Sequence, residues 1–94
     1  MKTVYKYSAT LGGTTRIQTP EYFYPLHFAV QGGMLRLWAL VDIVDDSIMV
    51  ARSIRVVGTG YELPDYIGKE HYIGTAQLPG GLVIHAFWET KIKD

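Results

Sequence analysis

The sequence predicts an all-β domain: a small antiparallel β-sandwich or partly open barrel of roughly six to seven short strands. Three observations support this fold class. Apolar and polar residues alternate with a period of two along most of the chain, as in strands with one buried face. Turn signals rich in glycine recur roughly every eight to twelve residues. No long segment has the spacing of an amphipathic helix.

Length and composition place these strands in a single domain spanning residues 1–94, with a charged tail at 90–94 that we expect to fray. Hydrophobic residues make up 48% of the chain and charged residues 19%, which favours a folded core over disorder. Nine basic and nine acidic residues give a net charge of zero, so we expect no strong non-specific binding to DNA. The chain has no cysteine, which excludes disulfides and thiolate metal sites.

The first part of the chain alternates strands and turns. Residues 2–8 and 14–18 read as strands on either side of Gly12-Gly13. The segment 21–25 is the one place where a helical turn is expected, closed by Pro25. A strand at 26–31 then leads into a hairpin turn.

The strand predicted at 34–42, after Gly32-Gly33, is apolar on both faces. Such a strand is covered on both sides, either within the domain or by a second subunit. Together with the absence of net charge and the seven tyrosines, this predicts a homo-oligomer, most simply a two-fold dimer.

The second half continues the pattern. Its elements are a polar turn at 42–47, a strand at 48–57, a loop at 58–69, a strand at 70–78, a turn at 79–81 and a strand at 82–89. The last strand alternates two sets of side chains: Leu82, Ile84, Ala86 and Trp88 on one face, and Val83, His85, Phe87 and Glu89 on the other.

No segment has the composition of a targeting or membrane sequence. The start, Met1–Lys6, lacks the apolar stretch of a signal peptide, and the longest apolar run, Leu37–Val41, is too short to span a bilayer. We therefore expect a soluble intracellular protein with no membrane partner.

The stretch "VVGTG" at 56–60 resembles a phosphate-binding loop but fails both motif tests. A Walker loop and a dinucleotide fingerprint each require a glycine where this chain has Leu63. The backbone N–H groups of Gly58, Thr59 and Gly60 are still candidates for a small anion-binding nest. The alternative is a bulge or tight turn at the rim of a sheet.

Candidate catalytic and metal residues are few. His27, His71 and His85 fall on different predicted strands, in no known metal spacing, so strand histidines with ordinary hydrogen bonds are expected. No serine lies in a nucleophile elbow. We expect no catalytic residue, no metal and no cofactor.

Large aromatic residues suggest a binding surface. Arg36 and Trp38 share one face of their predicted strand, and Trp88 lies on another strand. Arginine beside tryptophan suits base stacking or an interface with a protein partner. The alternative is that these residues belong to the core and its margin. We assign all three to a candidate interface.

Four motifs together resemble a family of small bacteriophage and prophage proteins with no assigned activity. They are "LWALVD" at 37–42, "RVVGTG" at 55–60, "YIGTAQL" at 72–78 and "VIHAFWE" at 83–89, and they extend over nearly the whole chain. The family often has histidine after Gly-Thr-Gly, where this chain has Tyr61. The resemblance implies a virus-encoded accessory protein of the host cytoplasm.

That context favours a non-enzymatic protein that binds: an antagonist of host defence that sequesters a signalling nucleotide. A direct inhibitor of a host defence or regulatory protein, or a structural phage protein, remain alternatives. For a nucleotide, we expect backbone donors, a cation and aromatic walls. The candidate ligand-binding residues are Arg55, Gly58, Thr59, Gly60, Tyr61, His71 and Thr75.

Overall fold

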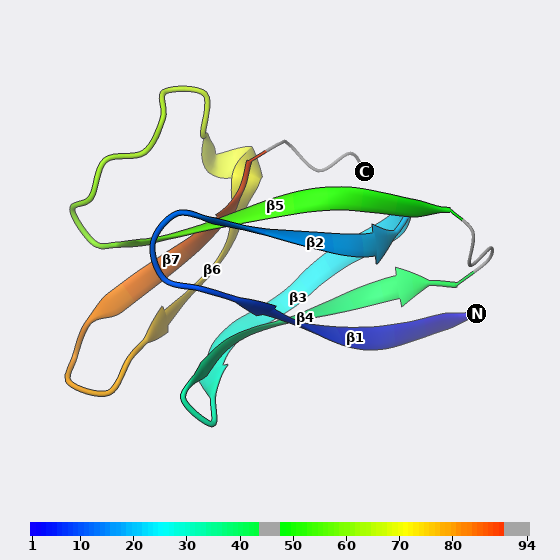
Figure 1. Ribbon diagram of the computed structural model, residues 1–94, viewed down its shortest axis with the longest axis horizontal. Helices are drawn as coiled ribbons and strands as arrows, with labels where there is room; N and C mark the ends of the chain where they lie inside the picture. The colour runs from blue at the N-terminus through cyan, green and yellow to red at the C-terminus, as the bar shows by residue number, and fades with distance from the viewer. Residues whose placement is uncertain (44–47, 90–94) are drawn as a thin grey trace.

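The computed structural model, which describes residues 1–43 and 48–89, consists of two stacked antiparallel sheets (Figure 1). Sheet A has the order β1-β4-β3 and sheet B the order β2-β5-β7-β6. The strands are β1 (Lys2–Ala9), β2 (Thr14–Pro20), β3 (Tyr22–Gln31), β4 (Met34–Asp42), β5 (Met49–Gly58), β6 (Tyr72–Gln77) and β7 (Val83–Trp88). The sandwich is not closed into a barrel, and the predicted all-β fold is confirmed.

Sheet A is a hairpin with one added strand. Gly32 and Gly33 join β3 to β4 with φ angles of 58° and 79°, the left-handed conformation that a two-residue hairpin turn requires. Strand β1 pairs with the other side of β4, from Lys2 opposite Asp42 to Ala9 opposite Leu35, without any shift of register.

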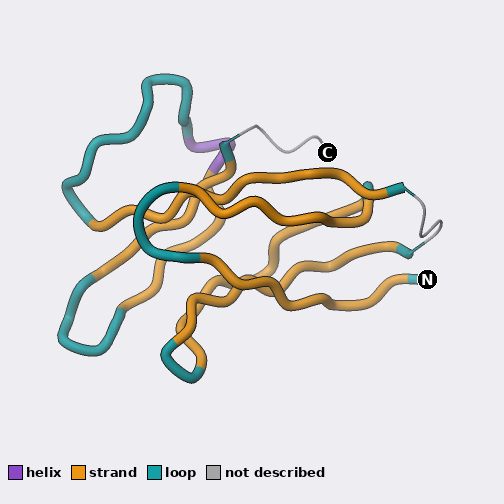
Figure 2. The backbone as a smooth tube through the Cα atoms, in the orientation of Figure 1, coloured by secondary structure: helices purple, strands orange, loops and turns teal. Residues whose placement is uncertain are grey.

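Sheet B contains a crossover. Strand β7 pairs antiparallel with both β5 and β6, so β5 and β6 run in the same direction on either side of it. The connection from β5 to β6, residues 59–71, must therefore return along the whole sheet. It includes a short 3-10 helix, η1 (Lys69–His71), and arcs beyond the end of β5 (Figure 2).

The core lies between the two sheets and takes one face of each strand. Its fully buried side chains are Trp88, Leu37, Ile54, Ile84, Val41, Val56 and Thr19. The Trp88 ring packs against the edge of Phe23, with ring centroids 5.1 Å apart. Where β6 approaches β3, a Cβ atom at Gly74 would lie 2.9 Å from the Phe28 Cβ, so the close approach of the sheets requires glycine there.

Two predicted elements differ from the structure. The helical turn expected at 21–25 is wrong, because these residues begin the extended strand β3. Pro25 sits at a bulge of this edge strand, where its missing N–H costs no ladder hydrogen bond. The strand expected from residue 70 begins only at Tyr72, after η1.

The strand β4 is covered on one face only within the described chain. Leu35, Leu37, Ala39 and Val41 are buried, whereas Arg36, Trp38 and Leu40 are half-buried and Met34 is exposed. Most of the turn predicted at 42–47, and the tail at 90–94, lie outside the described residues. Within the described part, no helix is long and apolar enough to cross a membrane.

Candidate functional site

The Gly-Thr-Gly stretch ends β5 with a tight turn. The Tyr61 N–H donates to the Gly58 carbonyl over 3.2 Å, and Gly60 has a φ of 88°, which only glycine adopts easily. The Thr59 N–H donates to the Val83 carbonyl, also over 3.2 Å. The Thr59 N–H, one of the three backbone donors that a phosphate nest would use, is therefore bonded inside the protein. The structure at Gly58 and Gly60 is thus a tight turn, the alternative to an anion-binding nest.

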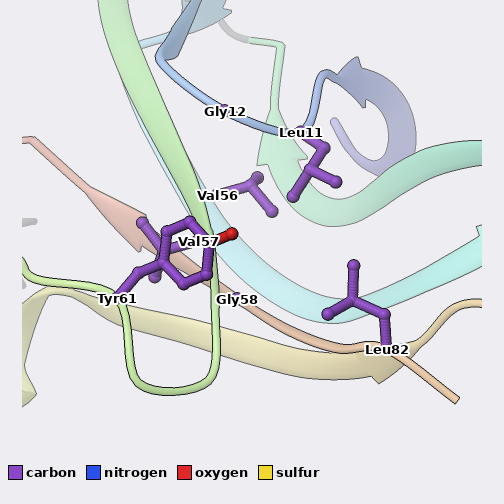
Figure 3. A pocket seen from close by; sticks show the side chains of 7 residues that line it. All are labelled: Leu11, Gly12, Val56, Val57, Gly58, Tyr61 and Leu82. Carbon is purple, nitrogen blue, oxygen red and sulfur yellow. The ribbon is translucent and has the colours of Figure 1, made fainter.

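A hollow of about 90 Å³ lies beside this turn, where β5 leaves sheet B (Figure 3). It is lined by Leu11, Gly12, Val56, Val57, Gly58, Tyr61 and Leu82. Apart from the Tyr61 hydroxyl, its side chains are hydrocarbon, so the hollow suits an apolar group better than a phosphate. The Tyr61 ring is 74% exposed at its margin.

A chain of hydrogen bonds runs across the outer face of sheet B, the face opposite the core. The His85 Nε2 lies 2.7 Å from the Thr59 hydroxyl, and its Nδ1 lies 3.0 Å from the Thr75 hydroxyl. The Tyr72 hydroxyl continues the chain, 2.6 Å from that of Thr75. A neutral imidazole has one donor and one acceptor, and either hydroxyl can serve either nitrogen. We call these four residues the imidazole chain.

Strand pairing positions the imidazole chain. His85 lies in the middle of β7, directly between Val57 of β5 and Thr75 of β6. Thr59 reaches it from the turn beyond the end of β5. The imidazole chain thus joins residues that are up to 26 positions apart in the sequence.

A second polar cluster lies on the same face, towards the other end of β7. The Arg55 Nε donates to Glu89 Oε1 over 2.5 Å, and the Tyr66 hydroxyl donates to Glu89 Oε2. The side chains of Arg55 and Glu89 are 27% and 17% exposed, so solvent screens this ion pair only in part. We call these three residues the Glu89 cluster.

The Glu89 cluster shifts the pKa of its members. Burial raises the pKa of Glu89, but the hydrogen bonds from Tyr66 and Arg55, together with the guanidinium charge, outweigh burial and hold it below its ordinary value. The hydrogen bond to Glu89 raises the pKa of the Tyr66 phenol, because ionised Tyr66 would be an anion beside a carboxylate. Glu89 is therefore a carboxylate at neutral pH.

The Glu89 cluster also holds the crossover connection against sheet B. The bond between Tyr66 and Glu89 fastens the middle of residues 59–71 to the outer face, whereas Tyr61, near their start, lies against Gly58 at the apolar hollow. At the end of the connection, His71 is 6% exposed and its Nδ1 accepts the Gly68 N–H over 3.0 Å. The connection therefore meets the outer face through Tyr66.

Phe87 separates the two polar groups. Phe87 lies between Arg55 of β5 and Tyr72 of β6 in the register of the sheet. The rings of Phe87 and Tyr72 meet edge to face, with centroids 5.7 Å apart. The outer face thus offers a cation, an imidazole, hydroxyls and two aromatic rings over neighbouring strands.

The structure brings together some of the residues expected to bind a ligand and separates others. Arg55, Thr59 and Thr75 share the outer face of sheet B. Tyr61 lies at the apolar hollow instead. His71 is buried and its Nδ1 accepts the Gly68 N–H, so the prediction that His71 contacts a ligand is wrong.

Four residues of the imidazole chain and the Glu89 cluster were missed from the sequence: Tyr66, Tyr72, His85 and Glu89. For two of them there was a signal, because the alternation of 82–89 places His85 and Glu89 on the same face.

The three expected interface residues divide between the surface and the core. Arg36 and Trp38 lie half-buried on the outer face of sheet A, where Arg36 donates to the Ser8 hydroxyl and the Trp38 ring lies 5.7 Å from that of His27. Trp88 is 2% exposed inside the core and has no surface for a partner, so its place in an interface is wrong. Among the described residues, no group of His, Asp or Glu is arranged to hold a metal ion.

Fold and site together define a small seven-stranded sandwich with a polar and aromatic outer sheet face. The chain belongs to a family described as "Domain of unknown function (DUF7352)", whose model matches residues 1–93. Comparisons with curated proteins and with solved structures found no match.

Proposed function

We propose that this protein is a non-enzymatic binding protein that holds a small anionic ligand, a nucleotide, on the outer face of sheet B. The observation that carries the proposal is the imidazole chain beside Arg55. It places hydroxyls, an imidazole and a guanidinium on one face, outside the core. These groups match the phosphate oxygens and sugar hydroxyls of a nucleotide.

Two arginines on the strands of this face supply positive charge for an anion. Arg16 of β2 is exposed and pairs with Ser53 of β5, so it shares the outer face with Arg55. On the strands of this face, the guanidinium groups of Arg16 and Arg55 thus accompany the carboxylate of Glu89. Phe87 and Tyr72 lie beside them and can contact a base.

The hydrogen bonding supports binding rather than catalysis. In a Ser-His-Asp arrangement a carboxylate orients the second ring nitrogen of the base, whereas the partner of His85 Nδ1 is the Thr75 hydroxyl and that of Nε2 is the Thr59 hydroxyl. Glu89, the carboxylate in the site, is neutralised by Arg55. We therefore propose that a bound nucleotide is retained unchanged, and that the protein sequesters a signalling nucleotide of the host.

A thermal-shift and calorimetry panel of cyclic and linear nucleotides tests this. A ligand that binds the folded state raises the melting temperature, and we expect such a rise for at least one nucleotide. The Thr75→Val variant removes one hydroxyl from His85 and should weaken binding about tenfold, the loss of one hydrogen bond. Thr3→Val, the same change on β1 of sheet A, should bind like the wild type. Chromatography should recover the nucleotide intact; if no nucleotide binds, or if it is consumed, the proposal is wrong.

A specific feature favours a second candidate, the direct inhibition of a host protein. The outer face of sheet A carries Trp38 and Leu40, both half-buried, beside Tyr24, which is 52% exposed. Tryptophan, tyrosine and arginine are the residues that dominate protein interfaces. Under this alternative no nucleotide binds, and Trp38→Ala, but not Thr75→Val, abolishes capture of one stoichiometric partner from host lysate.

A further inference from the structure

The free edge of β1 lacks the features that normally keep edge strands from pairing. Among the described residues, β1 pairs with β4 on one side and with no strand on the other. The edge strands β3 and β6 carry bulges, and β2 ends in Pro20. β1 has neither over its eight residues, and bulges and prolines are common means of blocking an edge. Its N-terminal half forms the lower right margin of the molecule in Figure 1.

The pairing with β4 shows which backbone groups are free. The Ile43 N–H donates to the Met1 carbonyl over 2.8 Å, so Met1 and Ile43 form a hydrogen-bonded pair. Such pairs alternate along an antiparallel ladder, so the odd-numbered residues of β1 point their backbone groups at β4. The N–H and C=O groups of the even-numbered residues face outward: Lys2, Val4, Lys6 and Ser8.

The two lysines of β1 do not block pairing at this edge. Charged side chains, lysine above all, commonly block edge pairing. Here the Lys6 ammonium donates to the Gln31 side chain over 3.0 Å, and the Lys2 ammonium lies 5.4 Å from the centre of the Tyr22 ring. Gln31 and Tyr22 belong to β3, on the far side of β4, so both lysines fold back across sheet A, away from the free edge.

We propose that the free edge of β1 pairs with β1 of a second copy of this chain, antiparallel about a two-fold axis at Tyr5. In this register Val4 lies opposite Lys6 of the second copy, and Lys2 opposite Ser8. All of these residues have outward backbone groups, so each forms a hydrogen-bonded pair. Tyr5 faces its own copy in a non-hydrogen-bonded pair, where side chains lie closest. Sheet A and its copy then form one continuous six-stranded sheet.

Charge selects this register over its neighbours. A two-fold axis at Val4 would place Lys2 opposite Lys6 twice, and an axis at Lys6 would place two copies of Lys6 opposite each other. Like charges directly opposite in a sheet are destabilising. The axis at Tyr5 avoids both arrangements, uses every residue from 2 to 8, and covers a tyrosine that is 40% exposed in the single chain.

Light scattering on the purified chain tests the pairing. We expect a mass twice the 10.6 kDa of one chain at tens of micromolar protein. Val4→Pro removes an outward N–H that β4 does not use, so it should return the mass to that of a monomer with little change in melting temperature. Val4→Ala keeps the N–H and should remain a dimer. A monomeric wild type, or a Val4→Pro variant that folds and stays dimeric, would overturn the proposal.

Cysteine cross-linking tests the register and remains decisive if Val4→Pro does not fold. The chain has no cysteine of its own, so a single introduced cysteine can form a disulfide only with the same cysteine of a second copy. Under mild oxidation, Tyr5→Cys should form a disulfide-linked dimer that reductant reverses, because its Cα atoms would lie within bridging distance. Thr3→Cys, which would lie opposite Tyr7, should stay unlinked. Efficient linking through Thr3→Cys, or none through Tyr5→Cys, would exclude this register.

Discussion

At the scale of single residues, Glu89 joins three parts of the fold through its side chain. It directly follows β7, accepts hydrogen bonds from Arg55 and Tyr66, and thereby ties the end of this strand, its neighbour β5 and the crossover connection together. Its N–H also extends the pairing with β5, donating to the Ser53 carbonyl over 3.0 Å. A carboxylate at this position acts on local stability and on the shape of the outer face.

The lowered pKa of Glu89 predicts how stability depends on pH. Because its pKa is lower in the folded than in the unfolded chain, its contribution is present above the unfolded value and is lost as pH falls through the folded value. Glu89→Gln should therefore cost about 1 kcal/mol at neutral pH, as expected for a partly exposed pair. The difference from the wild type should shrink on acidification. Urea denaturation from pH 7 to pH 3 measures it, and parallel curves would contradict the assignment.

At the scale of elements, the residue pattern within a segment and its pairing with a distant strand can favour different secondary structures. Only residues 26–31 of β3 were predicted as a strand, because the aromatic residues and Pro25 at 21–25 resemble a helical turn. Pairing with β4 extends the strand, and the bulge between Pro25 and His27 absorbs the proline. Tertiary pairing here overrides a local preference, as it commonly does in strands.

The crossover connection offers the clearest test at this scale. Tyr66→Phe removes the bond to Glu89 but keeps the ring, so residues 59–68 should open more easily while the core is unchanged. We expect faster hydrogen exchange and proteolysis within this segment, with a loss of global stability below about 1 kcal/mol. Tyr61→Phe is the matched control, since it removes a hydroxyl from the same connection at the apolar hollow. Equal protection in the two variants would show that the bond does not hold the connection.

At the scale of the whole molecule, the two tryptophans show what the stacking of the sheets decides. Both lie on strands with alternating side chains, and both were assigned to an interface. Sheet stacking places Trp88 in the core against Phe23 and leaves Trp38 on the outer face of sheet A. Trp88→Ala should therefore cost about 3–5 kcal/mol, a large part of the stability of a small domain. Trp38→Ala should cost far less. Denaturant titration of the two variants compares them directly, and similar losses would contradict the assignment of the faces.

The sequence by itself determined the all-β class, the glycine turns and the alternation within each strand. It also grouped Arg55, Thr59 and Thr75, three of the residues that meet on the outer face of sheet B. These features are local, because the pleat of a strand and the φ angle of a turn depend on adjacent residues.

Only the tertiary structure decided the order β2-β5-β7-β6, which sets His85 between Thr59 and Thr75 and brings Tyr66 to Glu89. It also decided which face of each strand is covered. Strand order and register join segments that are far apart in the chain, and they depend on how whole sheet faces pack together. The alternation of residues within one strand does not indicate which strand will be its neighbour.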